Sequence, residues 1–163
     1  MAGLASAGYS LFLATLPLVT TPSGYFLSPL SIQYALALAA NGAGPNSTTQ
    51  TELLRVMSVK GAGSPLTEAQ VNAALARASA LLTSQCPGAD GGSAAGSTNR
   101  SELILANSIW TAPGTQLRPG YTSQMQELFQ ATARVAANGA GDVNAWVSSV
   151  THGIIDNLLQ GEV

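Results

Sequence analysis

The sequence predicts an α+β fold in which helices outnumber strands. Apolar residues recur at helical spacing in several segments, and two of these segments begin with a helix-capping signature. Two shorter stretches, residues 102–111 and 131–136, have the composition of β-strands. Hydrophobic residues make up 46% of the chain and charged residues only 9%, whereas roughly 25% charged residues is usual. A chain of 163 residues with this composition is long enough to form one domain with a hydrophobic core.

Charge and cysteine content argue against several classes of partner and site. The net charge is −2, Lys60 is the single lysine, and the basic residues form no cluster. Nucleic acids, heparin-like polyanions and anionic membranes need concentrated positive charge, so none of them is expected as a partner. Cys86 is the single cysteine, which excludes an intrachain disulfide and a metal site built on a cysteine pair. We interpret it as a small apolar residue at a helix end.

The N-terminal region predicts a first helix over residues 4–16, ended by Pro17. The apolar run at residues 11–19 has no positively charged segment before it and is too short to span a bilayer. We therefore interpret the run as part of a buried helix, with an atypical secretion signal as the alternative. Residues 25–27 then predict a short strand.

An unusually apolar helix is predicted at residues 28–40. Ser28 is a favourable N-cap, and Pro29 suits the first helical position, where its missing N–H costs nothing. Gly42 follows as the C-terminal stop. Both faces of the helix are apolar, with Ile32, Tyr34, Ala35, Leu36, Ala37, Leu38, Ala39 and Ala40. A helix that is apolar all round is expected to be buried inside a larger structure.

Two capping boxes predict the next helices. The string TQTE at residues 49–52 opens a short helix, and TEAQ at residues 67–70 opens a longer one that reaches residue 84. The longer helix carries a single apolar stripe, formed by Val71, Ala74, Leu75, Ala78 and Leu82. It is therefore expected to lie at the surface with one face buried.

The second half of the chain predicts two strands and two helices. Residues 87–99 are rich in glycine, serine and alanine, and we interpret them as a flexible loop. Residues 102–111 are apolar on both alternating faces, with Asn107 as the polar exception, which predicts a strand covered on both sides. An amphipathic helix over residues 121–130 precedes the second strand. Asp142 is then expected to cap a helix with the inner stripe Val143, Trp146, Val147 and Val150.

Little in the sequence indicates an enzyme, a cofactor or a metal ion, and none is expected. His152 is the single histidine, and Asp156 follows it, so a serine-type triad would have to use this pair. No Gly-x-Ser-x-Gly motif accompanies them, which favours a histidine at a helix end. The glycine-rich stretches precede no phosphate-binding strand–loop–helix unit. An undetected hydrolase that uses His152 stays as a third hypothesis.

Four patterns and their order carry a resemblance to a known family. They are SPLSI at residues 28–32, the helix start TQTE at residues 49–52 after the turn NGAG, ANSIW at residues 106–110, and VNAWVSSVTHGII at residues 143–155. Each pattern alone is weak. Together, in this order and at these separations, they resemble the first part of a serpin over nearly the whole chain. The resemblance implies that the apolar helix at residues 28–40 lies beneath the main sheet of the fold.

The resemblance also implies structural roles for polar residues. The cluster called the shutter, at which the main sheet of a serpin opens to admit the reactive-centre loop, is matched by Ser28, Pro29, Ser31 and Asn107. The helix that crosses this sheet is matched by residues 142–151, and its structural positions by Asn144, Trp146, Thr151 and Gly153. Residues 67–84 match a helix that binds glycosaminoglycans in some serpins. Arg77 is its only basic residue, so no glycosaminoglycan site is expected.

The chain also departs from the family pattern. Gly24 stands where the family has an asparagine, and Ile154 replaces the lysine of Thr-x-Gly-Lys-Ile. The chain stops at Val163, where the family continues for more than this length again. Residues 1–163 are therefore expected to be the N-terminal part of a serpin domain, an incomplete fold without the reactive-centre loop. It would hold the N-terminal helices, one strand of the second sheet and two strands of the large sheet.

The resemblance implies a serine-type peptidase inhibitor with a serine or cysteine protease as its partner. In such inhibitors the protease cleaves the reactive-centre loop, which then inserts into the sheet as a strand. The alternative is a non-inhibitory serpin-like structural or interaction protein, or an inactive truncated product. The family implies the extracellular space, with the cytoplasm or nucleus as the alternative. Asn46 and Asn99 lie in Asn-x-Ser/Thr sequons and are glycan acceptors if the chain is secreted.

Overall fold

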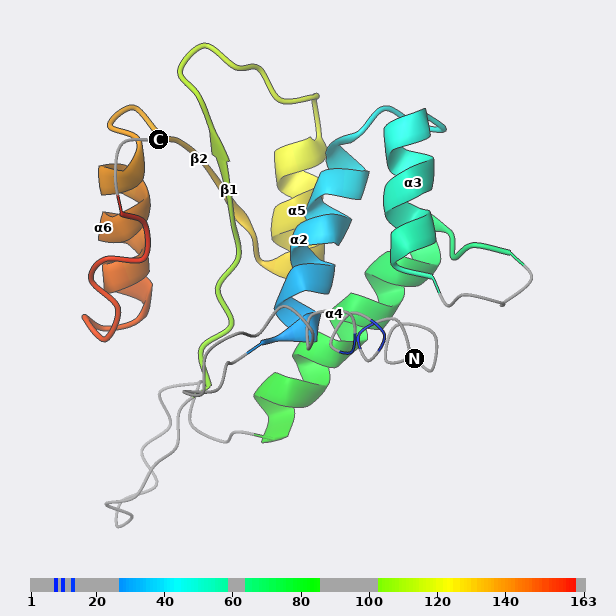
Figure 1. The fold of residues 1–163 in the computed structure, drawn as a ribbon, viewed down its shortest axis with the longest axis horizontal. Coiled ribbons are helices and arrows are strands. Elements are labelled where there is room, and N and C mark those ends of the chain that lie inside the picture. Colours follow the sequence, from blue (N-terminus) through cyan, green and yellow to red (C-terminus); the bar gives the residue numbers. More distant parts are fainter. Residues whose placement is uncertain are drawn as a thin grey trace. The chain divides into compact units, whose positions relative to one another are not determined.

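The computed structural model describes residues 8, 10, 13, 27–58, 64–85 and 103–160. Its elements follow in the order α2 (Pro29–Gly42), α3 (Thr48–Val56), α4 (Glu68–Gln85), β1 (Ser108–Thr111), α5 (Tyr121–Phe129), β2 (Thr132–Val135) and α6 (Ala140–Val150) (Figure 1). The chain divides into two compact units, Met1–Arg77 and Ala78–Val163. Helices with a small sheet confirm the α+β class.

Parts of the expected N-terminal region and the expected loop lie outside the described residues. Of the predicted first helix, only positions 8, 10 and 13 are described, and all three are helical. Of the strand predicted at residues 25–27, only Leu27 is described, and it lies in no strand. The loop predicted at residues 87–99 falls outside the described part altogether.

Helix α2 begins as the sequence predicts, but it is not covered all round. The Ser28 side chain accepts a hydrogen bond from the backbone N–H of Ser31 at 3.3 Å, as an N-cap does. Ser31, Ala35 and Ala39 are exposed, although burial of every face was expected. These positions are four residues apart and share one face of the helix, which no described element of the first unit covers. The buried face carries Gln33, Tyr34, Ala37, Leu38, Ala40 and Asn41.

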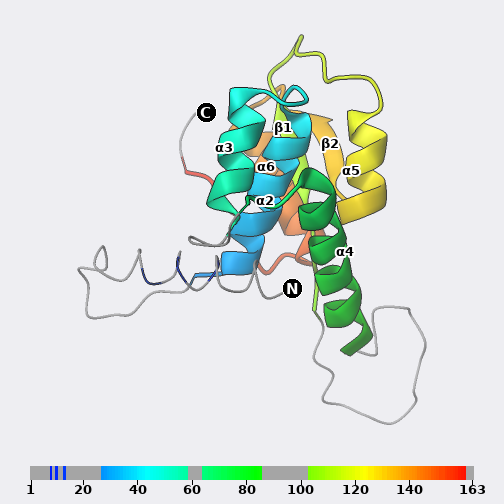
Figure 2. The ribbon, with the colours of Figure 1, turned by 90° about the vertical axis from the view of Figure 1, so that its right-hand side faces the viewer.

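The core of the first unit lies where α2 meets α3 and the first part of α4. Figure 1 and Figure 2 both show α2 and α3 side by side. The Tyr34 hydroxyl of α2 donates a hydrogen bond to the Leu75 carbonyl of α4 at 2.7 Å. Met57, Val71 and Leu75 are almost fully buried. The apolar stripe predicted for α4 therefore faces the core in its first half.

One of the two expected capping boxes is correct, and at the other the cap is displaced by two residues. At α4, Thr67 Oγ1 accepts the Gln70 N–H at 3.3 Å, and Gln70 Oε1 accepts the Thr67 N–H at 2.9 Å. At α3 the N-cap is Ser47 and not Thr49, because Ser47 Oγ accepts the Gln50 N–H at 3.2 Å. The Gln50 side chain in turn accepts the N–H of Asn46 at 2.8 Å. Ser47 thus caps α3 two residues earlier than expected, and Gln50 holds the N–H of the residue before the cap, not that of the cap itself as in a capping box.

The sheet of the second unit is a parallel pair. Strand β1 pairs with β2 in register from Ser108 opposite Thr132 to Thr111 opposite Val135. The expected strand at residues 102–111 is therefore shorter, and its faces are only half-buried; Ile104 is 40% exposed. A strand is defined by its ladder, and β2 offers only four residues for pairing. Helix α5 connects the two strands, as parallel pairing requires.

The two helices of the second unit pack apolar faces inward. In α5 the buried residues are Tyr121, Met125 and Phe129, in agreement with the predicted amphipathic pattern. Helix α6 begins at Ala140 with Gly139 as its N-cap, so Asp142 is a residue of the first turn and not the expected cap. The stripe predicted for α6 is fully buried at Val147, and Val143, Trp146 and Val150 are half-buried. No described helix has the length and apolar character to cross a membrane.

Candidate functional site

The start of α2 holds three of the four residues that match the shutter. Ser31 Oγ donates a hydrogen bond to Ser28 Oγ at 2.8 Å, and the Ser31 N–H points at the same oxygen. Ser28 and Pro29 are half-buried, whereas Ser31 is exposed. Ser28 Oγ therefore accepts twice from the same residue, once from its backbone and once from its hydroxyl. The serine pair is therefore an open polar site at one end of the apolar helix.

Asn107, the fourth of these residues, ties β1 to the end of α5. Its side-chain N–H donates to the Phe129 carbonyl at 3.0 Å, and its own carbonyl accepts the Thr132 N–H at 3.0 Å. It is half-buried just before the first residue of β1. Asn107 belongs to the second unit and the serine pair to the first. Their association in one cluster stays a prediction.

Asn144 of α6 anchors the segment that follows the helix. Its Oδ1 accepts the backbone N–H groups of Leu158 and Leu159 at 3.0 and 2.9 Å. Its Nδ2 donates to the Leu159 carbonyl at 2.9 Å. One side chain thus makes three hydrogen bonds to a segment without regular structure. This geometry supports a structural role for Asn144.

Thr151 and Gly153 form the C-terminal stop of α6. The Gly153 N–H donates to the Ser148 carbonyl at 2.8 Å, and the His152 N–H to the Ser149 carbonyl at 3.4 Å, which is the Schellman pattern. His152 and Gly153 have positive φ angles of 53° and 76°. Thr151 Oγ1 donates to the Val147 carbonyl at 2.8 Å and accepts the Ile155 N–H at 3.1 Å. The pattern Thr-x-Gly therefore forms the C-terminus of the helix, and the Thr151 hydroxyl adds two hydrogen bonds to it.

The side chains around His152 do not follow the order of a catalytic triad. In a triad the histidine stands between the carboxylate and the serine. Here the Ser148 hydroxyl donates directly to Asp156 Oδ1 at 2.8 Å. His152 is the left-handed residue that ends α6, in agreement with the interpretation as a helix-end histidine. Among the described residues, no group of three or more His, Cys, Asp or Glu side chains is placed to hold a metal ion.

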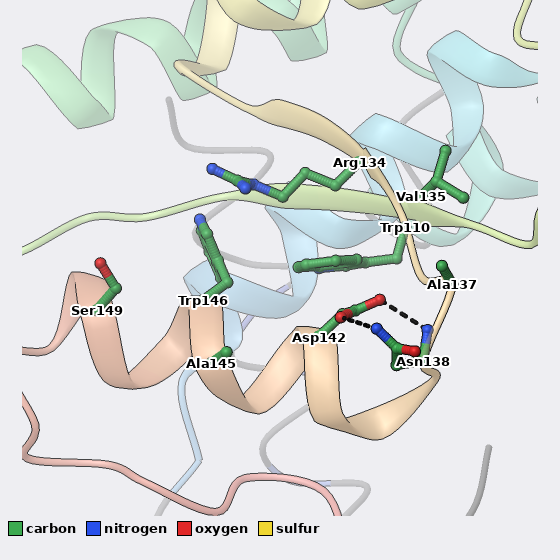
Figure 3. A pocket seen from close by; sticks show the side chains of 9 residues that line it. All are labelled: Trp110, Arg134, Val135, Ala137, Asn138, Asp142, Ala145, Trp146 and Ser149. Atoms are coloured by element: carbon green, nitrogen blue, oxygen red, sulfur yellow. Dashed lines mark hydrogen bonds between the residues drawn. The ribbon is translucent and has the colours of Figure 1, made fainter.

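Trp146 of α6 and Trp110 of β1 meet across the space between helix and sheet. Their ring centroids are 6.2 Å apart and their planes are inclined at 74°, an edge-to-face contact. Trp110 Nε1 donates to Ser108 Oγ at 2.8 Å, which fixes the orientation of that ring. Figure 3 shows both rings beside a cavity of about 620 Å³. The structural role expected for Trp146 is consistent with this contact.

The other end of this cavity holds an ion–dipole pair. Asp142 accepts the backbone N–H of Asn138 at 2.8 Å and its side-chain N–H at 3.0 Å. The backbone N–H of Asn138, helped by its side-chain amide, holds the pKa of Asp142 below its usual value. The carboxylate therefore stays ionised at neutral pH. Sequence reasoning did not single out this cavity, because it depends on which residue of β2 lies beside Trp110.

Comparison with known proteins settles the family. The family model for serpins, described as serine protease inhibitors, matches residues 11–163. The chain belongs to the serpin family. This confirms the resemblance carried by the four sequence patterns, and the described elements form part of the serpin fold. No relative was found among curated protein sequences.

Solved serpin structures share the fold of this chain at low sequence identity. Lamprey angiotensinogen, cleaved in its reaction loop, is 23% identical with a TM-score of 0.67 over 98% of this chain and 43% of its own. Serpin-12 of Manduca sexta is 21% identical with a TM-score of 0.69 over 97% of this chain and 40% of its own. The native stressed form of Arabidopsis AtSerpin1 is 20% identical with a TM-score of 0.66 over 96% of this chain and 37% of its own. The chain spans about two fifths of the length of these proteins.

Proposed function

We propose that this chain is the N-terminal portion of a serine-type peptidase inhibitor and not an enzyme. The observation that carries the proposal is the match of the serpin family model over residues 11–163. The proposed partner is a serine protease, or a cysteine protease, that attacks the reactive-centre loop of the whole inhibitor. The protease forms an acyl-enzyme with the loop, and the cleaved loop inserts as a strand, which holds the enzyme in that state.

The local structure supports this proposal because it supplies parts that such a mechanism needs. Strands β1 and β2 form a parallel pair, and parallel pairing leaves N–H and C=O groups along the outer edge of each strand for a further strand. The serine pair at the start of α2 and Asn107 at the start of β1 are proposed as the polar contacts that break and reform when the sheet opens. Hydrogen bonds between hydroxyl and amide groups suit this role, because each contributes only about 0.5–1.5 kcal/mol.

The second proposal is a non-inhibitory serpin-like protein, or an inactive truncated product, that acts through binding. The serpin structures that share this fold are only 20–23% identical to the chain, so the shared fold does not by itself distinguish an inhibitory from a non-inhibitory member. An extracellular location goes with either proposal, with the cytoplasm or nucleus as the alternative. If the chain is secreted, Asn46 is accessible to a glycan, because it is exposed in the turn before α3. Asn99, the other acceptor, lies outside the described residues.

Further partner classes are not proposed. In the described part of α4, the helix that matches the glycosaminoglycan-binding helix of some serpins, Arg77 is the basic residue, and a single exposed arginine is too little for a polyanion. Nucleic acids and anionic membranes are not proposed as partners either, because the chain has only six basic residues and a net charge of −2. A protease is therefore the partner that we propose.

The test is to incubate the natural protein that carries these residues with trypsin-like and chymotrypsin-like proteases. We expect a complex that survives SDS, because the bond between inhibitor and protease is covalent. The matched control is the same protease with its active-site serine blocked, which should form no such complex. The isolated 163-residue chain should also form none, because trapping needs a cleavable loop and a sheet that accepts it. Cleavage of the natural protein by every protease without a covalent complex would favour the non-inhibitory alternative.

A further inference from the structure

The space between α6 and the β1–β2 pair has the size of a small-molecule site. This cavity, which we call the tryptophan cavity, measures about 620 Å³. Cavities of roughly 300–1,000 Å³ are typical of sites for small ligands. Its lining includes Trp110, Arg134, Val135, Asp142, Trp146 and Ser149 (Figure 3). All of these residues belong to the second unit.

Regular secondary structure brings these side chains together. Trp110 and Arg134 are partners in the register of β1 and β2, so their side chains leave the same face of the sheet. On α6, Asp142, Trp146 and Ser149 are three or four residues apart and share one face of the helix. The cavity is therefore built on strands and a helix, which hold side chains more firmly than a loop does.

The apolar part of the tryptophan cavity suits a planar ring. The two indole rings are inclined at 74°, so they form two walls of a corner and not a closed stack. The Trp110 ring is held in place by its hydrogen bond to Ser108. A flat aromatic ligand in this corner would stack on one ring and meet the other edge-on, the two arrangements that aromatic groups prefer.

The polar part carries hydrogen-bond donors at one end. Figure 3 shows the Arg134 guanidinium, the Trp146 ring nitrogen and the Ser149 hydroxyl toward the end of the cavity away from Asn138. Within the ranges that the structure describes, none of these three groups has a hydrogen-bond partner. The lining carboxylate, Asp142, lies at the opposite end and is occupied by two hydrogen bonds from Asn138. The three donors therefore lie at the end of the cavity opposite to its carboxylate.

We propose that the tryptophan cavity binds a small aromatic molecule that carries a carboxylate or sulfonate group. The anionic group would accept hydrogen bonds from Arg134, whose planar guanidinium matches two oxygens at once, and from Trp146 Nε1. The aromatic ring would fill the corner between Trp110 and Trp146. The Asp142 carboxylate sets the orientation, because it repels an anionic group from its own end. The residues that line this site include none of the four that match the shutter.

The test uses three ligands with the same ring and different charge: naphthalene-2-sulfonate, neutral 2-naphthylmethanol and cationic 2-naphthylmethylamine. They are titrated into the natural protein, and binding is followed by calorimetry and by the NMR signals of the tryptophan N–H groups. We expect naphthalene-2-sulfonate to bind most tightly and to shift the Trp146 N–H signal. The variant Arg134→Gln should weaken that ligand about tenfold or more and leave 2-naphthylmethanol unchanged, because only the charged contact is lost.

The matched control is Arg77→Gln, which removes one positive charge from an exposed site outside the cavity and should leave all three affinities unchanged. Trp146→Phe keeps an aromatic wall and removes the N–H donor, so it should weaken the sulfonate more than the alcohol. Arg134 is exposed, so Arg134→Gln is expected to fold even if Trp146→Phe does not. Three results would overturn the proposal: no binding of the sulfonate, equal affinity for the neutral ligand, or an unchanged affinity in Arg134→Gln.

Discussion

Two buried asparagines offer a sharp test of the packing in the first unit. Asn41 of α2 donates to Asn72 Oδ1 at 2.9 Å, and Asn72 of α4 donates to Asn41 Oδ1 at 2.8 Å. The two side chains are 1% and 6% exposed. A reciprocal amide pair of this kind links the two helices in one relative position. Since buried amides are costly without partners, both asparagines should contribute to stability only together.

We predict that Asn72→Ala lowers the free energy of unfolding by about 2–3 kcal/mol. The substitution removes two buried hydrogen bonds, and each contributes about 1–1.5 kcal/mol. Asn41→Ala should cost somewhat more, because Asn41 also donates to the Ala37 carbonyl at 2.8 Å. In the double variant the second substitution should cost less than it does alone, with a coupling of about 0.5–3 kcal/mol.

The assay is urea denaturation of the natural protein and its variants, read from the midpoint and slope of the transition. Asn157→Ala is the matched control, because Asn157 is exposed, and it should change stability by less than about 0.5 kcal/mol. The reasoning would be refuted if Asn72→Ala behaved like this control. It would also be refuted if the two single costs simply added in the double variant.

Three other substitutions, one of them with a control, test the ends of α6 and α2. Gly153→Ala should lower the free energy of unfolding by about 1–2 kcal/mol in thermal denaturation, because Gly153 has a φ angle of 76°, which is unfavourable for alanine. The control is Gly141→Ala inside the helix, which should be neutral or stabilising. Because the pKa of Asp142 is lowered in the folded protein, its ionised carboxylate stabilises the fold above about pH 4, and this effect is lost as the pH falls through the folded pKa. Asp142→Asn should therefore lose less stability than the unsubstituted protein between pH 7 and pH 3, as measured by urea titrations. If Ser31 belongs to the shutter of the whole serpin, Ser31→Leu should cost about 2–4 kcal/mol, and an unchanged melting temperature would contradict that assignment.

Local signals in the sequence were sufficient for the helices but not always for their first residues. The box at Thr67 was correct because both of its partners lie within one turn. At α3 the strings that begin at Ser47 and at Thr49 both have the residue types of a capping box, and the side chain of Ser47 is the one that caps the helix. Gly139 is the N-cap of α6, and Asp142 lies in the first turn, where its carboxylate accepts the backbone N–H of Asn138. Competing caps a few residues apart are difficult to rank without the tertiary contacts.

Strand length and the cavity could not be predicted, because both depend on residues far apart in the chain. The apolar alternation at residues 102–111 indicated an extended segment, but the ladder extends only where β2 provides partners. The tryptophan cavity needs the register that places Arg134 beside Trp110. Periodicity alone does not contain this register. The exposed stripe of α2 was missed for a similar reason, since an apolar composition does not say which element covers each face.

Family membership is shown, and the central proposal is that the natural protein carrying these residues is an inhibitory serpin whose sheet accepts its own loop as a strand. The most direct test is the melting temperature of the natural protein before and after a protease has cut this loop once. Insertion of the cleaved loop adds strand hydrogen bonds and releases stored strain, so we predict a clear rise in melting temperature on cleavage. A melting temperature that stays the same or falls on cleavage would contradict the claim.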